Sequence, residues 1–137
     1  DRFAVLSPLE STVRPTRALV RHYGLAEKCA AVRSVDCGVM ELRAGRHETF
    51  EKVLAVARRC LAEDGADTLV LACASLSHRF GDALAAALPV PVVNVLRASV
   101  RLAEFLVGSR LSHSKVAYPT PPARPRGAAS VRAGGGA

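Results

Sequence analysis

Short apolar runs alternate with longer amphipathic stretches along this chain of 137 residues. Runs of this length, bounded by turn residues, are typical of β-strands. The run 68–72 has no charged residue, which is typical of a parallel strand buried on both faces, so we expect it at the centre of a sheet. The run 29–35 is less apolar and is expected nearer a sheet edge. The predicted strands are residues 3–6, 29–35, 68–72 and 91–95.

The amphipathic stretches predict helices between these strands. The clearest helix lies between about residues 47 and 63, where apolar residues recur at the i, i+3, i+4, i+7 spacing and charged residues fill the other positions. Cys60 falls on its apolar face, so we interpret it as a structural thiol. The other predicted helices run from a cap at Ser11 or Thr12 to Tyr23, from about His78 to Leu88, and from about Arg97 to Gly108, and residues 36–46 are expected to form a loop.

This alternation of strands and helices predicts βαβ units with right-handed crossovers. The fold class is therefore α/β, a doubly wound, flavodoxin-like parallel sheet of about four strands. The final predicted helix is apolar over a wider face than packing on one sheet requires. We expect residues 1–114 to form one lobe, and residues 115–137, rich in Pro, Ala, Arg and Gly, to be a basic tail too poor in apolar surface to order itself.

The composition indicates where the chain is located and which classes of partner it should lack. No stretch approaches the about 18 consecutive apolar residues of a membrane span, and no signal-peptide pattern precedes the first strand. The four cysteines form no Cys-x-x-Cys pair and no metal-ligand spacing, so we expect free thiols in a reducing cytoplasm. The net charge is +7, and four of the basic residues lie in the tail, which has no acidic residue. The chain before the tail has no stripe of basic residues with interleaved aromatics, the pattern expected for nucleic-acid binding. We therefore expect neither nucleic acid nor membrane as a partner.

Cys73 stands where the apolar run 68–72 ends and a small polar segment begins. The carboxyl ends of parallel strands form the crevice in which open α/β sheets hold their ligands. A thiol there, just before a helix, also meets free backbone amides and the positive end of that helix, and both favour thiolate over thiol. Cys73 is therefore the candidate catalytic residue, with a buried structural thiol as the alternative.

Three further polar residues are weaker candidates. Cys37, in the predicted loop, could oppose Cys73 only if that loop folded across the crevice, so an incidental loop thiol is the favoured interpretation. His78 could assist Cys73 or bind a carboxylate, but a surface histidine is the commoner case. Asn94, near the carboxyl end of the last predicted strand, is as well explained by a structural amide as by a ligand contact.

Several short segments, with Cys73 among them, occur in an order that resembles a known family. They are Asp1 to Leu6, Arg21 to Leu25 followed by Cys29, Leu61 to Ala66, Leu71 to Ala74, Pro89 to Val93 and Leu111 to Lys115. Each is weak alone, but together they resemble the carboxyl-terminal half of an Asp/Glu/hydantoin racemase, closest to the hydantoin or allantoin racemase branch. The resemblance extends from Asp1 to about Pro122.

The resemblance implies two α/β lobes with the substrate between them and one cysteine from each lobe. One thiolate removes the proton from the stereogenic carbon and the opposite thiol delivers one to the other face, without metal, pyridoxal phosphate or nucleotide. Inversion needs an acid and a base on opposite faces of one carbon, which explains the pair of thiols. Cys73 matches the second-lobe cysteine.

The same resemblance indicates which residues should contact the substrate and shows two places where the chain departs from the family pattern. Ser7 and Pro8 stand where the hydantoin branch usually has paired threonines that contact the ligand, and Ala72 and Ser75 stand where it usually has glycines. These departures bear on the identity of the substrate more than on the reaction class. We expect the substrate to be bound by Ser7, Ala74, Ser75 and Asn94.

The first lobe and its cysteine would lie before Asp1, so we interpret the chain as an inactive fragment of a cofactor-independent racemase that is a homo-oligomer when complete. Two alternatives remain open. Superfamily relatives such as arylmalonate decarboxylases and maleate isomerases use the second-lobe cysteine differently, and a non-catalytic binding module would not use it at all.

Overall fold

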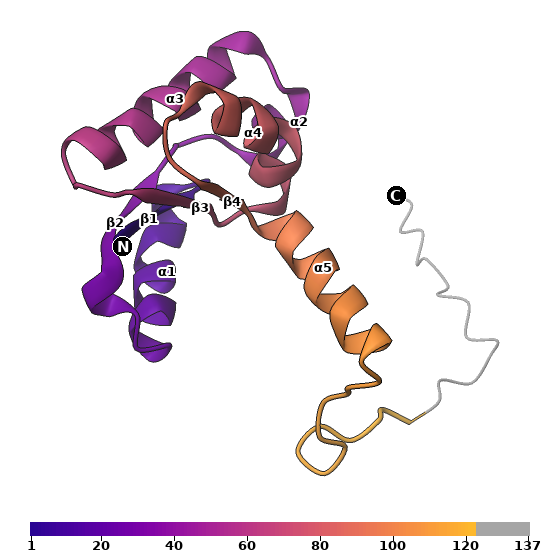
Figure 1. The fold of residues 1–137 in the computed structure, drawn as a ribbon. Coiled ribbons are helices and arrows are strands. Elements are labelled where there is room, and N and C mark those ends of the chain that lie inside the picture. The colour runs from indigo at the N-terminus through magenta and orange to yellow at the C-terminus, as the bar shows by residue number, and fades with distance from the viewer. Residues whose placement is uncertain (123–137) are drawn as a thin grey trace, which may run out of the picture.

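The computed structural model describes residues 1–122, and its centre is a four-stranded parallel sheet (Figure 1). The spatial order of the strands is β2-β1-β3-β4, and every adjacent pair is parallel. The prediction that the second strand lies at an edge and the third at the centre is confirmed. The strands are β1 Phe3–Ser7, β2 Cys29–Ser34, β3 Thr68–Leu71 and β4 Val92–Asn94.

Helices lie on both faces of this sheet, as the predicted α/β class requires. In Figure 1, α1 lies on one face, α2, α3 and α4 lie on the other, and α5 leaves the body of the molecule after β4. The helices are α1 Glu10–His22, the 3₁₀ turn Ala26–Lys28, α2 Val39–Ala44, α3 His47–Ala62, α4 Ala74–Ala87 and α5 Val95–Gly108.

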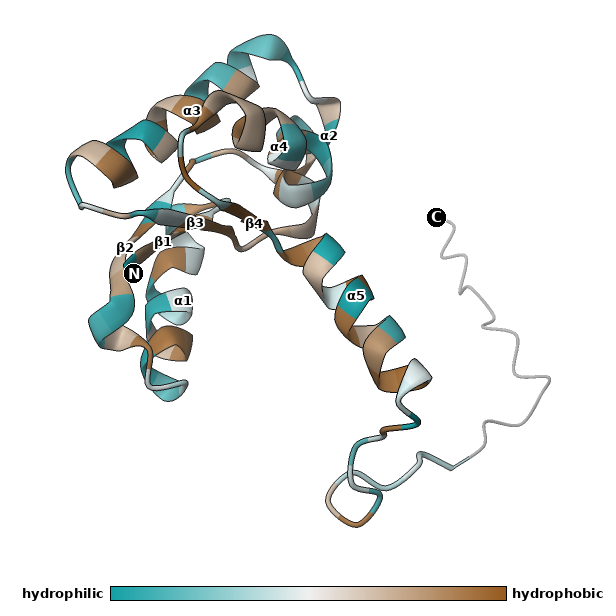
Figure 2. Cartoon of the chain, in the orientation of Figure 1, coloured by the Kyte–Doolittle hydropathy of each residue, from teal (hydrophilic) through white to brown (hydrophobic). Residues whose placement is uncertain are grey.

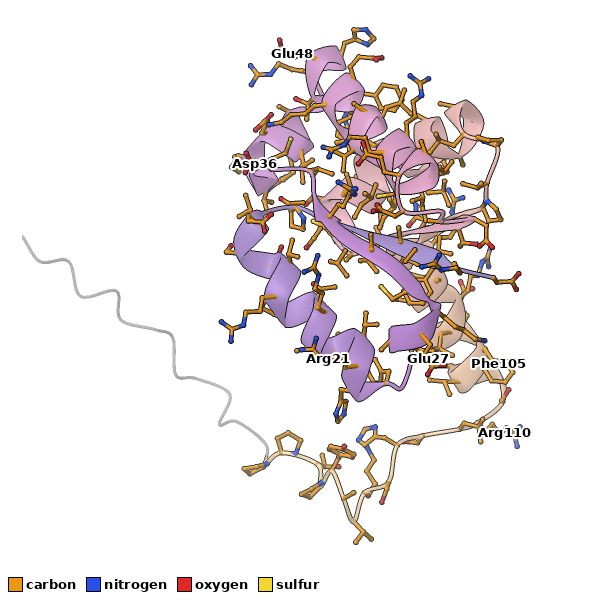
Figure 3. The ribbon with its side chains drawn as sticks, turned by 90° about the vertical axis from the view of Figure 1, so that its left-hand side faces the viewer. Arg21, Glu27, Asp36, Glu48, Phe105 and Arg110 are labelled. Atoms are coloured by element: carbon orange, nitrogen blue, oxygen red, sulfur yellow. The ribbon has the colours of Figure 1, made fainter. Side chains whose placement is uncertain are left out.

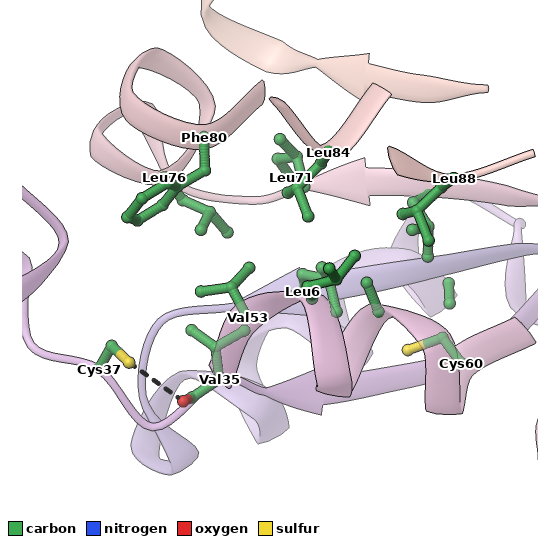
Figure 4. Close-up of a cluster of buried hydrophobic side chains, with 14 of the residues drawn as sticks. Leu6, Val35, Cys37, Val53, Cys60, Leu71, Leu76, Phe80, Leu84 and Leu88 are labelled. Atoms are coloured by element: carbon green, nitrogen blue, oxygen red, sulfur yellow. Dashed lines mark hydrogen bonds between the residues drawn. The ribbon is translucent and has the colours of Figure 1, made fainter. Parts of the chain in front are cut away.

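The two faces of the sheet bury different amounts of apolar surface. Side chains alternate along each strand, so Ala4 and Leu6 of β1 point toward α3 and α4, whereas Val5 points toward α1. Figure 4 shows the larger cluster, in which Leu6 and Leu71 of the sheet meet Val53 and Leu84 of the helices. The smaller cluster beside α1 has only three buried members, so most of the core lies on the α3 and α4 side.

Helix α3 agrees with its sequence pattern. Val53, Ala57 and Cys60 are fully buried on the face that packs on the sheet, and the structural interpretation of Cys60 is supported. The helix end is tied to the edge strand by Arg33, whose Nε donates to Asp64 at 2.6 Å. That ion pair holds the carboxyl end of α3 against β2.

Two predictions in the amino-terminal half were wrong. Helix α1 begins at Glu10 with Leu9 in the N-cap position, so Ser11 and Thr12 lie inside its first turn. Neither is the N-cap residue, although the Thr12 hydroxyl accepts the backbone amide of Leu9 at 3.4 Å. Residues 36–46 are not a plain loop, because α2 occupies Val39–Ala44 and buries Leu42. Gly45 ends α2 in the left-handed region at φ 62°, which glycine adopts without the steric cost of a Cβ.

The carboxyl-terminal helices also start earlier than predicted. Helix α4 begins at Ala74, not at His78, and α5 begins at Val95, not at Arg97. None of the residues of α5 is buried, and Phe105 is 60% exposed. Most of the apolar residues that colour α5 brown in Figure 2 are therefore exposed.

The predicted division into a lobe and a tail is only partly visible. Residues 115–122 are exposed, and the remainder of the predicted tail, residues 123–137, lies outside the described residues. Of the helices between residues 1 and 122, none has the length and apolarity needed to cross a membrane.

Candidate functional site

Cys73 lies immediately after β3 and is the N-cap residue of α4. Its backbone is extended, with φ −142° and ψ 130°, and its carbonyl oxygen accepts the amide hydrogen of Ser77 at 2.9 Å to close the first turn of α4. The side chain is half-buried against the main apolar cluster. The structure thus places Cys73 at the carboxyl end of a central strand, as the sequence predicted. It also places Cys73 at the start of a 14-residue helix, which was predicted to begin only at about His78.

Ser77 fixes this turn against two strands and was not singled out from the sequence. Its buried hydroxyl donates to the carbonyl oxygen of Leu71 at 3.3 Å, and its own carbonyl accepts from Asn94 Nδ2 at 2.9 Å. A serine in a helix is common, so nothing in the sequence distinguishes Ser77 from a surface residue. The hydrogen bonds connect β3, α4 and β4, and so they hold the backbone around Cys73.

Asn94 uses both ends of its side-chain amide within the protein. Nδ2 donates to Ser77, and Oδ1 accepts the backbone amide of Arg97 at 3.0 Å, which caps α5. Gly81 allows this close approach, since a Cβ there would lie 2.7 Å from Nδ2. The geometry favours the structural interpretation of Asn94, and its contact with a substrate stays a prediction.

The remaining predicted contacts occupy different environments. Ser7 ends β1, is 1% exposed, and its Oγ lies 2.6 Å from Thr12 Oγ1. Because the Thr12 hydroxyl donates to the carbonyl of Leu9, Ser7 is the donor in that pair. Ala74 and Ser75 are the first two residues of α4, with Ala74 exposed and Ser75 half-buried. Ala74 and Ser75 are therefore beside Cys73 and open, whereas the Ser7 hydroxyl is enclosed.

The other three thiols lie in less accessible or less favourable settings. Cys37 is fully buried, and its Sγ lies 3.3 Å from the carbonyl oxygen of Val35 (Figure 4). Burial raises the pKa of the Cys37 and Cys29 thiols, and it raises the pKa of Cys60 to about 11. The loop after β2 bends beside β1, with the Cys37 amide donating to Pro8, but it turns the thiol into the core. The interpretation of Cys37 as a structural thiol is therefore favoured.

Figure 3 locates the end of the sheet at which the candidate residues gather. Asp36 follows β2 at one end of that strand, and Glu27 precedes it at the other. Because all four strands are parallel, Ser7, Cys73 and Asn94 lie at the Asp36 end. Open α/β sheets hold their ligands at this end, beside the carboxyl ends of the strands.

A cavity of about 420 Å³ opens beside the start of α4. It is lined by Arg43, Ala74, Ser75, His78, Arg79 and Leu96. Arg43 comes from α2, a segment that was predicted to be loop, so nothing in the sequence pattern indicated that it would line a cavity with Ala74 and Ser75. Arg79 was also missed, and its guanidinium packs over Gly45, where a Cβ would collide with Nε and Cζ.

His78 and Leu96 also line an adjoining cavity of about 540 Å³. There Arg97 pairs with Asp82 at 3.0 Å and Arg101 pairs with Glu104 at 2.8 Å, so each cation has a carboxylate partner. The sequence had suggested that His78 begins a helix. In the structure His78 is exposed and lies one turn after the start of α4. Across residues 1–122, no group of three or more His, Cys, Asp or Glu side chains is placed to hold a metal ion.

Comparison with known proteins gives consistent results. The chain is 36% identical over 121 residues to a hydantoin racemase from Rhizobium meliloti, covering 86% of this chain and 50% of that protein. It is 32% identical over 113 residues to a hydantoin racemase from Paenarthrobacter aurescens, covering 82% and 48%. The chain thus spans about half the length of the curated relatives it matches.

A solved structure and a family model agree with these relatives. The crystal structure of allantoin racemase from Pseudomonas fluorescens superposes with a TM-score of 0.75 at 30% identity, over 90% of this chain and 52% of that one. The family model described as Asp/Glu/Hydantoin racemase matches residues 1–103, which include β1 to β4 and Cys73. This chain therefore belongs to the Asp/Glu/hydantoin racemase family.

Proposed function

We propose that this chain is the second half of a cofactor-independent racemase that inverts a stereogenic carbon in a hydantoin, allantoin or amino acid, with Cys73 as one of two acid–base thiols. The observation that carries the proposal is the position of Cys73, half-buried after β3 at the start of α4 and directly before Ala74 and Ser75, which line an open cavity. The relatives that the chain matches are hydantoin and allantoin racemases.

The proposed reaction needs only proton transfers. The Cys73 thiolate takes the proton from the stereogenic carbon, and the electron pair of the broken C–H bond moves onto the oxygen of the adjacent carbonyl. A second thiol on the opposite face protonates the carbon and becomes a thiolate, so the two residues exchange roles for the reverse reaction. The second thiol would come from a further lobe, in keeping with relatives twice as long as the matched region.

The first turn of α4 supplies the electrostatic part of the proposal. The amides of the first helical residues, among them Ala74 and Ser75, have no partner within the helix and lie at its positive end. They are suited to donate to an oxygen that gains negative charge as the proton leaves. Ser77 and Asn94 would act as positioning residues, since they hold this turn against β3 and β4.

The exposed apolar face of α5 also supports a two-lobed protein. Val100, Leu102 and Phe105 are each more than half exposed, although the helix follows directly from the edge of the sheet. We propose that this face packs on the first lobe in the complete enzyme. That the complete enzyme is a homo-oligomer stays a prediction.

Replacement of Cys73 by serine in the complete two-lobed protein tests the mechanism. A hydroxyl is a far weaker acid than a thiol, so racemisation should fall on the order of 10²–10⁴-fold, the range that general acid–base catalysis supplies. In D₂O the variant should still exchange the α-hydrogen of one enantiomer without inverting it, because the opposite thiol remains. The 137-residue chain alone, assayed by optical rotation, should not racemise hydantoins or amino acids.

Cys29→Ser is the matched control, since Cys29 is a half-buried thiol at the opposite end of the sheet. It should leave racemisation nearly unchanged. Racemisation of both enantiomers at the normal rate by Cys73→Ser would eliminate Cys73 as a catalyst. Loss of carbon dioxide from an arylmalonate, or isomerisation of maleate, would instead favour a single-cysteine enzyme.

A further inference from the structure

We propose that the cavity beside Cys73 binds a carboxylate carried by the substrate, through Arg43 and Arg79. This inference rests on the proposed function for the identity of the ligand as substrate. The proposed substrate is therefore a hydantoin or an amino acid that carries a carboxylate in addition to the groups at its reacting carbon.

The charge balance of the cavity is the first argument. Within residues 1–122 its lining includes two arginines and His78 but no Asp or Glu. In that same range the side chains of Arg43 and Arg79 form no hydrogen bond or ion pair. The adjoining cavity differs, because Arg97 and Arg101 each have a carboxylate partner. Two positive side chains without a carboxylate partner beside one cavity favour the binding of an anion there.

The placement of Arg79 is the second argument. Its guanidinium lies so close to the backbone of Gly45 that an added Cβ would be 2.5 Å from Cζ. Arg79 therefore crosses from α4 to the end of α2, the helix that carries Arg43. The guanidinium of Arg79 therefore lies near the helix that carries Arg43, and the two oxygens of a carboxylate match the paired donors of such a group.

The position of the cavity is the third argument. Its wall includes Ala74 and Ser75, which directly follow Cys73 in the chain. A ligand whose carboxylate lay between the two arginines would therefore extend along the first turn of α4 toward the thiol. The size of the cavity, about 420 Å³, is sufficient for a small organic anion.

Titration of the ¹⁵N-labelled chain with succinate, followed by NMR, tests the inference without requiring catalysis. Succinate should shift the amide signals of Ala74, Ser75 and Arg79, whereas the neutral analogue succinamide should not. Arg43→Gln and Arg79→Gln should each weaken succinate binding roughly fivefold, the effect expected for one exposed ion pair. Added salt should weaken binding further.

Arg101→Gln is the matched control, because it removes the same charge from the adjoining cavity. It should leave succinate binding unchanged, and equal weakening by all three variants would show a general effect of net charge and overturn the proposal. Absence of succinate shifts would overturn it as well, and tighter binding of inorganic phosphate than of succinate would overturn the assignment to a carboxylate.

The Cys73→Ser variant separates this inference from the proposed function. It should bind succinate as the unaltered chain does, since the thiol is not one of the proposed anion ligands. If succinate fails to bind while Cys73→Ser abolishes racemisation in the complete enzyme, the carboxylate site is refuted and the mechanism stands. If succinate binds while Cys73→Ser leaves racemisation intact, the anion site stands but its assignment to a racemase substrate falls.

Discussion

Helices α3 and α5 have similar lengths and similar amphipathic character, but they bury very different amounts of surface. Helix α3 has 16 residues, five of them buried, whereas α5 has 14 residues and none is buried. In Figure 1, α3 lies across the sheet and α5 leads away from it. An apolar helical face is therefore present in both, but within the described chain only α3 buries it.

The topology of the sheet explains this difference. Helix α3 lies in the connection between β2 and β3, which are the two neighbours of β1, so the chain must pass across the sheet at this point. Helix α5 follows β4, an edge strand, and within residues 1–122 no later strand returns to the sheet. An apolar hollow of about 440 Å³ beside α1, lined by Phe3, Val5 and Val70 among others, likewise remains open.

A matched pair of substitutions tests the comparison directly. Val53→Asp in α3 places a carboxylate in a fully buried site, and we expect it to prevent stable folding, since an unpaired buried charge and a lost side chain together cost more than about 4 kcal/mol. Val100→Asp in α5 changes a side chain that is 51% exposed and should alter the free energy of unfolding by less than about 0.5 kcal/mol. Urea unfolding monitored by circular dichroism measures both.

Val53→Ala is the milder control for the buried position. It should cost about 1–3 kcal/mol and leave the fold intact, which allows a measured comparison even if Val53→Asp yields no soluble protein. Destabilisation by Val100→Asp equal to that of Val53→Ala would contradict the open position of α5.

A second comparison concerns the reactivity of two thiols, Cys60 in the core beneath α3 and Cys73 at the carboxyl end of β3. Burial raises the pKa of Cys60 to about 11, so near neutral pH its thiolate fraction is roughly a hundredfold below that of a free thiol, in addition to its full burial. Cys73 is half-buried at a helix start, so it should react with iodoacetamide well before Cys60 and Cys37. Mass-mapped labelling gives the order, and labelling of Cys60 before Cys73 would count against the site.

A further prediction concerns the end of α3 and its dependence on pH. Arg33 holds the pKa of Asp64 below its usual value by donating two hydrogen bonds to it, which favours the folded state while the carboxylate is charged. This stabilisation is fully present above the unfolded pKa of about 3.9 and disappears as the pH falls through the lower folded pKa. Asp64→Asn should therefore lower the free energy of unfolding by about 1 kcal/mol at neutral pH and by much less in acid.

Urea midpoints of the two proteins at several pH values measure this difference. Asp82→Asn is the control, since Asp82 also pairs with an arginine but its side chain is 79% exposed. Its effect should be close to zero at every pH. A pH-independent loss in Asp64→Asn would show that the ion pair is not its cause.

The strand and helix pattern could be predicted because its signals are local. Buried strands need apolar runs and buried helices need a 3.6-residue period, so the four strands, α3 and the position of Cys73 at a strand end all follow from neighbouring residues. The order of these elements also indicated the α/β class. The sequence by itself therefore determined the sheet and the place of the candidate thiol.

Other features depend on contacts through space and were decided by the tertiary structure. Helix α2 has only six residues, too few to show a period, and without it Arg43 has no predictable relation to Arg79. The early start of α4 and the bonds of Ser77 depend on β3 and β4 lying side by side. The orientation of α5 depends on which surfaces surround it, because an amphipathic pattern specifies that one face is apolar but not which surface covers it.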